Sequence, residues 1–307
     1  MHIGVQWRLT EPQPVDYGVV RGLCAALCGR YPHLRYAPVG RSVLGREIPA
    51  LVLAPQGGTQ RVLLAAAFHG QEWLTALWTL RLCEDLCRAL RSGLPLCGVP
   101  VGRALSDRQI WFIPLVNPDG VEIARYGSGA AGMYAASAAA AGADRPGLWQ
   151  ANARGVDINH NFNAGWEEMQ ALAQKSGKIH AGPRQYAGEY PESEPETQAL
   201  TALCRRLSFR HVVALHSQGE EIYWSYGDNT PSRSRMMARV LGAASGYRVT
   251  APEGLASHGG FKDWFIRQFG RPGFTIEMGR GQNPLPVADF EPVYQQTREM
   301  LLLSLLL

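Results

Sequence analysis

The chain has 307 residues, of which 46% are apolar and 18% are charged, and it contains 34 Gly and 20 Pro. This composition excludes a disordered chain, a collagen and a coiled coil, and the length is sufficient for one large α/β domain with a full apolar core. The formal net charge is only +4 and no basic run is interleaved with aromatic residues, so we expect no nucleic-acid partner.

The sequence predicts a cytoplasmic protein without a membrane anchor. Residues 1–8 lack the charged-then-apolar order of a signal peptide, and the longest apolar run, residues 300–307, is shorter than the ~20 residues that span a bilayer. The cysteine pairs Cys24/Cys28 and Cys83/Cys87 are each spaced by four on predicted helices. We expect them to be buried thiols rather than disulfides or a second metal site.

Helical and strand patterns alternate along the chain. A helix over 15–30 is followed by two strands, 35–40 and 47–53, around a turn. Continuous apolar runs, typical of strands buried on both faces, follow at 62–68, 110–116, 212–215 and 274–276. Amphipathic stretches predict helices at 73–90, 197–207, 232–244 and 260–269.

This alternation predicts a single α/β domain over residues 1–307, with a core at about 17–286 and a C-terminal helix at about 289–305. We expect a mostly parallel sheet covered by helices on both faces. The leucines of residues 300–307 fit either packing on that sheet or a contact in a homodimer.

Two local predictions concern the middle of the chain. Ser193 with Glu196 three residues later is the capping-box signature of a helix start. The segment 127–147 contains an alanine run that favours a helix, whereas its flanking glycines favour a surface excursion.

Each predicted buried strand is followed by polar residues that chemistry could use: His69, the Asx turn at Asn117, His216 and Glu277. In open α/β sheets, ligands bind outside the carboxyl ends of the strands. The positions therefore predict one shared site.

His69, Glu72 and His216 form a set of ligands suited to zinc. Two imidazoles and one carboxylate leave a fourth position open, as in hydrolytic zinc sites, and Glu277 would act as general base. Each residue alone also has an ordinary explanation, such as a solvated histidine or a helix-start glutamate. A carboxylate in line with a buried strand is harder to explain without a cation, since its burial costs several kcal/mol.

The motifs of the chain, taken together, resemble those of the zinc carboxypeptidases, the M14 metallopeptidases. These motifs stand in the order His69–Glu72, Val116–Gly120, Arg154–Asn159, Ser193–Glu196, Leu215–Ser217 and Phe274–Glu277. The resemblance implies one Zn²⁺ held by His69, Glu72 and His216, with Glu277 as general base. It also implies a mixed, mainly parallel, eight-stranded sheet between helices.

Two positions depart from the family's pattern. The pair that normally reads Asn-Arg, whose Arg receives the substrate's terminal carboxylate, is Asn159-His160 here. The Arg that normally follows a Trp and polarises the scissile carbonyl is Gln150. Neither side chain can replace the fixed charge and donor fork of a guanidinium, which weakens the prediction of an ordinary carboxypeptidase.

The γ-D-glutamyl-meso-diaminopimelate peptidases, which cut bacterial cell-wall peptides, are the subgroup that the chain resembles most. The shared motifs are Trp149–Asp157, His216–Trp224, Gly259–Phe265 and Glu277–Pro286. That subgroup often carries LysM modules, and this sequence shows none. The resemblance implies a cytoplasmic enzyme that acts on soluble muropeptides, in wall recycling or sporulation.

Substrate contacts are predicted from the charges of diaminopimelate, which has carboxylates and an amine. Asn159, His160, Arg154 and Arg280 are candidate donors to the carboxylates, and Glu220 or Glu221 could accept the amine. Gln150 is predicted to donate to the developing oxyanion, and His258 is a candidate substitute for a family tyrosine near the leaving group.

Two alternatives remain open at this point. One is a carboxypeptidase or amidohydrolase for another small acidic peptide. The other is a binding module that keeps the fold without the reaction, against which the complete ligand set and Glu277 argue.

Overall fold

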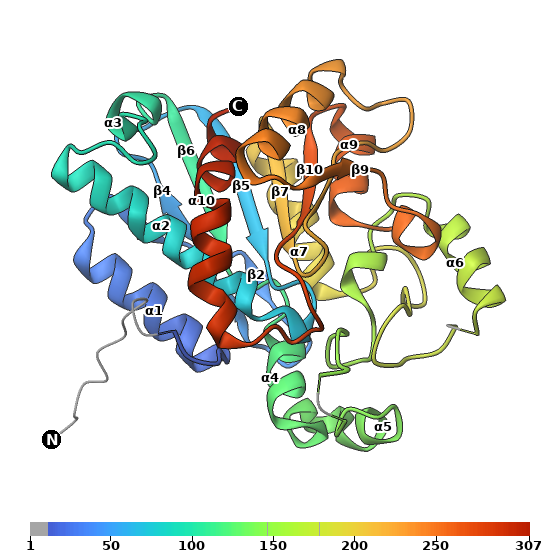
Figure 1. The fold of residues 1–307 in the computed structure, drawn as a ribbon. Helices are drawn as coiled ribbons and strands as arrows, with labels where there is room; N and C mark the ends of the chain where they lie inside the picture. Colours follow the sequence, from blue (N-terminus) through green and yellow to red (C-terminus); the bar gives the residue numbers. More distant parts are fainter. Residues whose placement is uncertain (1–11, 146, 178) are drawn as a thin grey trace, which may run out of the picture.

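The computed structural model describes residues 12–145, 147–177 and 179–307, and these form an α/β fold around one large sheet (Figure 1). The sheet has eight strands, in the spatial order β1 (Leu34–Tyr36), β4 (Leu51–Leu53), β6 (Arg108–Ile113), β5 (Gln60–Ala66), β7 (His211–His216), β10 (Gly273–Glu277), β8 (Glu221–Tyr223) and β9 (Arg248–Thr250).

The predicted mixed and mainly parallel sheet is confirmed. Its centre, β6, β5, β7 and β10, is parallel throughout. Antiparallel pairs join β4 to β6 and β1 to β4 on one side, and β8 to β10 on the other, while β9 runs parallel to β8. The carboxyl ends of the four central strands therefore meet at one edge of the sheet.

The continuous apolar run of β5 is explained by burial on both faces. Val62, Leu64 and Ala66 face one apolar core, and Leu63 and Ala65 face the other. All of these side chains are fully buried, as the alternation of side chains along a strand requires.

Helices cover both faces, as predicted (Figure 1). One core includes residues of α1 (Tyr17–Arg30), α2 (Leu74–Ser92), α8 (Ser232–Ser245) and α10 (Phe290–Leu306). The other includes residues of α7 (Pro195–Leu207) and α9 (Phe261–Phe269). Shorter helices lie in the connections: α3 (Val101–Ala104), α4 (Pro118–Tyr126), α5 (Ala135–Ala140) and α6 (Trp166–Lys175).

The predicted strand pair before β5 is present but interrupted. Its outer part is the two-stranded ladder of β2 (Gly40–Arg41) and β3 (Glu47–Ile48), and its inner part is the β1–β4 pair. Pro38 and Pro49 lie at the break, where a residue without an N–H cannot donate to the ladder. The backbone bonds from Ala37 to Ala50 and from Val39 to Ile48 carry the pairing across it.

The capping box predicted at Ser193 is wrong. Helix α7 begins at Pro195, and its N-cap residue is Glu194, which makes no side-chain cap bond. The Glu196 carboxylate instead accepts hydrogen bonds from the backbone N–H of Val43 and from Asn152. The Glu196 side chain, which a capping box would use, is therefore buried between α7 and the turn that joins β2 to β3.

The segment 127–147 combines both predictions made for it. Its alanine run forms the short helix α5, and a 3-10 helix at Ser128–Tyr134 precedes it, with a break at Gly132. Figure 1 shows α5 projecting at the lower edge of the molecule, away from the sheet. A small apolar cluster that includes Ala138 and Trp149 attaches the segment to the rest of the chain.

Intrachain packing explains the leucines of the C-terminal helix. Leu301, Leu302 and Leu305 are fully buried in the core, so a dimer contact is not needed to explain them. The cysteines are free thiols; Cys24, Cys83 and Cys87 are buried as expected, whereas Cys28 is partly exposed. Across the described part of the chain, no helix has both the length and the apolar character to cross a membrane.

Candidate metal centre

The predicted ligands converge at the carboxyl edge of the sheet. His69 follows β5, Glu72 ends the 3-10 helix Gly70–Glu72, and His216 is the last residue of β7. Glu72 Oε1 lies 2.7 Å from Nδ1 of His69, and Glu72 Oε2 lies 3.0 Å from Nδ1 of His216. One ligand atom from each residue lies within 4.8 Å of the other two.

The turn that carries His69 and Glu72 is closely packed. A Cβ on Gly70 would lie 2.1 Å from the carbonyl oxygen of Gly120, so a side chain cannot be accommodated there. The Gly70 N–H donates to the Gln150 carbonyl at 3.0 Å, and Thr75 Oγ1 donates to the Glu72 carbonyl at 2.7 Å. The backbone of the predicted ligand pair is therefore held on both sides.

The electrostatics of this site suit a divalent cation. Glu72 is buried, and although burial opposes its charge, the imidazoles of His69 and His216 outweigh that effect and lower the pKa of Glu72 to about 2. An ionised carboxylate between two imidazole nitrogens is the donor set of hydrolytic zinc sites. The chemistry of the donors and their convergence therefore fit zinc.

Glu277 lies beside these ligands. It is the last residue of β10 and pairs in register with His216 on the parallel neighbour β7. Burial of the carboxylate, together with the Glu72 charge, raises the pKa of Glu277 to about 8. A cation bound by His69, Glu72 and His216 would lower that pKa again, because it stabilises the charged form.

Asp157 also belongs to this site, although no role was predicted for it from the sequence. Its Oδ1 lies 3.1 Å from His69 Nε2, the nitrogen that faces away from Glu72. Histidines that bind metals commonly donate their second N–H to a carboxylate in this way. Asp157 lies within the motif Arg154–Asn159, which the sequence shares with the family, but its contact with His69 depends on the fold of the 154–160 segment.

Gln150 and Asn159 lie close to the ligands. The Gln150 carbonyl accepts from Gly70, and its side chain is partly exposed. Asn159 Oδ1 accepts from the backbone N–H of Phe261 at 3.0 Å, so the amide's NH₂ end points the other way. Both side chains carry an amide NH₂ group, which is a hydrogen-bond donor.

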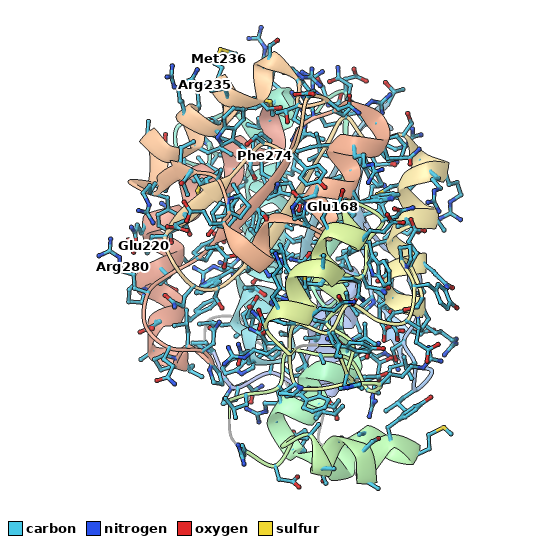
Figure 2. All side chains as sticks on the ribbon, turned by 90° about the vertical axis from the view of Figure 1, so that its right-hand side faces the viewer. Glu168, Glu220, Arg235, Met236, Phe274 and Arg280 are labelled. Atoms are coloured by element: carbon cyan, nitrogen blue, oxygen red, sulfur yellow. The ribbon has the colours of Figure 1, made fainter. Side chains whose placement is uncertain are left out.

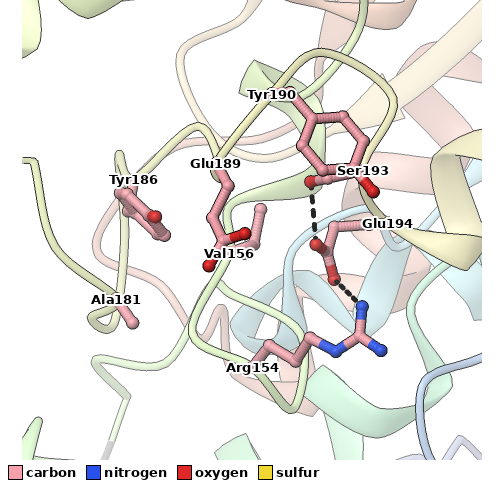
Figure 3. Close-up of a pocket in the computed structure, with 8 residues that line it drawn as sticks. All are labelled: Arg154, Val156, Ala181, Tyr186, Glu189, Tyr190, Ser193 and Glu194. Carbon is pink, nitrogen blue, oxygen red and sulfur yellow. Dashed lines mark hydrogen bonds and ion pairs between the residues drawn. The ribbon is translucent and has the colours of Figure 1, made fainter.

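His160 and Arg154 are each engaged by a carboxylate. His160 Nδ1 lies 3.1 Å from Asp157 Oδ2. The Arg154 guanidinium lies 3.5 Å from Glu194, on the wall of a cavity of about 240 Å³. Figure 3 shows this ion pair, and the cavity's other walls include Tyr186 and Tyr190 rather than any metal ligand.

Arg280 and Glu220 form an ion pair with each other at 2.5 Å, and the Arg280 side chain is 79% exposed. Figure 2 shows the two residues together at the periphery of the molecule. Glu221 lies opposite Glu277 in the antiparallel β8–β10 pair, where it contacts Arg248 and accepts a hydrogen bond from Tyr223.

Two further residues singled out from the sequence, His258 and Asn117, make hydrogen bonds within the protein. His258 Nδ1 lies 3.3 Å from the Tyr226 hydroxyl, in a cavity of about 440 Å³ that both residues line. Asn117 caps α4 by accepting from the Gly120 N–H, and it donates to the carbonyls of Phe68 and Ala151. The Asx turn thus supports the site's backbone instead of supplying a ligand.

Comparisons with known proteins agree with this geometry. A family model described as zinc carboxypeptidase matches residues 20–300. The γ-D-glutamyl-L-diamino acid endopeptidase 1 of Lysinibacillus sphaericus is 34% identical over 304 residues, which cover 98% of this chain and 75% of the relative.

Two solved structures with carboxypeptidase-like folds are similar to the structure of this chain. Thrombin activatable fibrinolysis inhibitor has a TM-score of 0.75 and 19% identity, covering 95% of this chain and 73% of that chain. The murein-tripeptide amidase MpaA of Escherichia coli O157 has a TM-score of 0.53 and 22% identity, covering 88% of this chain and 91% of that chain. On the family match over most of its length, the chain belongs to the zinc carboxypeptidase family of metallopeptidases.

Proposed function

We propose that this zinc peptidase hydrolyses the γ-D-glutamyl–meso-diaminopimelate bond of bacterial cell-wall peptides, with one Zn²⁺ per chain and Glu277 as general base. The observation that carries the hydrolytic chemistry is the convergence of His69, Glu72 and His216 next to Glu277. The substrate is supported by the relative named γ-D-glutamyl-L-diamino acid endopeptidase 1, which aligns with 98% of this chain.

Different groups of the protein would perform the separate steps of amide hydrolysis. Zinc, when bound, supplies a Lewis acid that makes a water nucleophilic near neutral pH and polarises the carbonyl. The Glu277 carboxylate takes the proton of the attacking water and delivers it to the leaving amine. The Gln150 amide donates to the oxygen on which negative charge develops.

Substrate carboxylates would be received on the side of the site that carries Asn159. Its NH₂ group is a donor separate from the Oδ1 atom that accepts from Phe261. His160, Arg154 and Arg280 remain proposed donors, although each already contacts a carboxylate of the protein and would have to exchange or share it. Glu220 and Glu221, the proposed acceptors of the amine, have cationic partners in the same way.

A panel of peptides tests this proposal. Purified protein with measured zinc content is incubated with stem tri- and tetrapeptides that contain a γ-D-Glu–diaminopimelate bond, and with ordinary peptides that have free C-termini, and the products are identified by mass spectrometry. We expect cleavage between γ-D-Glu and the diamino acid. Removal of only C-terminal residues from the ordinary peptides would instead show a carboxypeptidase, and absence of turnover with no bound zinc would show a binding module.

A further inference from the structure

A buried carboxylate connects two histidines of this site. Asp157 is fully buried, and its two oxygens face different rings: Oδ1 lies 3.1 Å from His69 Nε2, and Oδ2 lies 3.1 Å from His160 Nδ1. Backbone N–H groups also reach it, from Asn159 to Oδ1 at 3.2 Å and from Gln185 to Oδ2 at 3.0 Å. Each oxygen thus lies 3.1 Å from one ring nitrogen and accepts a hydrogen bond from one backbone N–H.

The charge of Asp157 decides where the imidazole protons lie. Asp157 is fully buried between two imidazole rings and two backbone N–H groups, which stabilise a carboxylate in its charged form. An ionised carboxylate only accepts hydrogen bonds, so His69 Nε2 donates its proton to Oδ1. Nδ1 of His69 is the nitrogen directed at Glu72 and the metal position, where a bound cation would take its lone pair.

The local backbone places His160 against Asp157. The 3-10 helix Ile158–His160 begins directly after Asp157, its N-cap residue, and side chains three residues apart lie over each other in such a helix. The backbone is closely packed there: a Cβ on Gly259 would lie 2.7 Å from the His160 carbonyl oxygen, and the His160 N–H donates to the Asp157 carbonyl at 2.9 Å. The His160 side chain is only 12% exposed, so its contact with Asp157 is largely removed from water.

We propose that His160 is a positioning residue for the metal centre, acting on His69 through Asp157. The backbone N–H groups of Asn159 and Gln185 each hold one oxygen of Asp157, and the His160 ring adds a second contact on Oδ2. This added contact restrains the carboxylate plane and, with it, the His69 ring. This inference depends on the zinc site of the proposed function and not on the identity of the substrate. It differs from the substrate contact predicted for His160 from the sequence, and the two roles affect different measurements.

The test compares four variants of the full chain. H160A and H160L both remove the donor, and Leu keeps much of the ring's bulk in case the Ala variant does not fold. H160N places an amide N–H where the ring has Nδ1. H33A, at an exposed histidine between α1 and β1, is the matched control for loss of an imidazole.

Zinc release to a chelator and the visible spectrum of the Co²⁺-substituted protein are measured without substrate, and kcat and KM are measured with any peptide that is cleaved. In H160A or H160L we expect zinc to leave about 10-fold faster, the Co²⁺ spectrum to shift and kcat to fall at constant KM. H160N restores most of each value, and H33A changes none.

The inference would be overturned if H160A and H160L raised KM but left zinc release and the Co²⁺ spectrum unaltered. That result would show that His160 contacts the substrate. If the wild type cleaves no γ-D-glutamyl peptide but zinc release responds as described, the proposed substrate fails and the role of His160 stands.

Discussion

At the scale of single residues, charge balance explains most of the site. Glu72 is a buried carboxylate that contacts two imidazoles through separate oxygens, and Asp157 repeats this arrangement one step further from the metal position. Glu277 has no imidazole at comparable distance among the described contacts, and its pKa is raised to about 8 in the absence of a cation. The position of Glu277 beside the ligands is therefore best explained by a cation that lowers this pKa and leaves the carboxylate ionised.

The proposed role of Glu277 as general base predicts that turnover and metal binding can be separated. In E277Q the shape of the side chain is kept but its basicity is lost, so we expect kcat to fall by about 10²–10⁴-fold. Zinc content, measured by metal analysis of the purified variant, should equal that of the wild type because His69, Glu72 and His216 are unchanged. Full turnover of a cleaved peptide by E277Q would show that another group is the base.

Gln150 predicts a smaller loss that is confined to the chemical step. Q150A removes a donor from the loop whose carbonyl binds Gly70. If that amide stabilises the oxyanion, we expect kcat to fall by about 10²–10³-fold with little change in KM. Q198A, at an exposed glutamine on α7, controls for loss of an amide elsewhere. A change in KM alone would show that Gln150 contacts the bound substrate rather than the developing oxyanion.

At the scale of elements, Asn117 joins several segments that surround the site. It is fully buried, caps α4 and donates to the carbonyls of Phe68 and Ala151. These carbonyls belong to the chain just before His69 and to the loop after Gln150. One side chain thus fixes the relative positions of a helix start and two loops.

This arrangement predicts an unusually costly helix cap. N117A leaves buried carbonyls without a donor as well as removing the cap, and we expect it to lower the free energy of unfolding by about 3 kcal/mol. D16A, which removes the more exposed cap of α1, should cost only about 1 kcal/mol. Urea unfolding of both variants gives the comparison, and equal losses would mean that the buried carbonyls find other partners.

The elements themselves could largely be predicted from the sequence, because local periodicity reports burial. The apolar runs at 62–68 and 212–215 correspond to β5 and β7, and the amphipathic stretch at 73–90 corresponds to α2. The capping box failed because Glu196 has partners at Val43 and Asn152, which lie far away in the sequence. Local pattern cannot show a partner that only the tertiary fold provides.

At the scale of the whole molecule, the site could be predicted where it follows from sheet topology. The rule that parallel strands end at one edge brought His69, His216 and Glu277 together without any knowledge of strand order. The same rule placed Asn117 at that edge but could not separate a ligand from a helix cap. The network of His160 and Asp157 was not predictable, because it depends on a 3-10 turn and on Gln185 in an irregular segment.

The sheet and the C-terminal helix are joined at the end remote from the metal centre. Helix α10 crosses the sheet and ends near the amino ends of β6 and β7, where Arg108 donates to the Leu306 carbonyl and Arg210 to the Leu307 carbonyl. His211, the first residue of β7, is fully buried and donates from Nε2 to the Ser304 carbonyl at 2.7 Å. Its Nδ1 has no hydrogen-bond partner among the described residues.

This junction predicts how stability depends on pH. Burial, together with the charges of Arg210 and Arg108, lowers the pKa of His211 from 6.5 to about 4. As pH falls, the unfolded chain therefore binds the proton before the folded chain does. The contribution of His211 to the free energy of unfolding is complete above pH 6.5 and is lost progressively toward pH 4, by up to about 3 kcal/mol.

H211Q tests this dependence, because glutamine keeps a donor at the position of Nε2 but cannot titrate. Urea unfolding between pH 4.5 and 7.5 should give a shallower pH dependence for H211Q than for the wild type, since the other titrating groups are common to both proteins. Parallel curves would show that His211 titrates alike in the folded and unfolded chain.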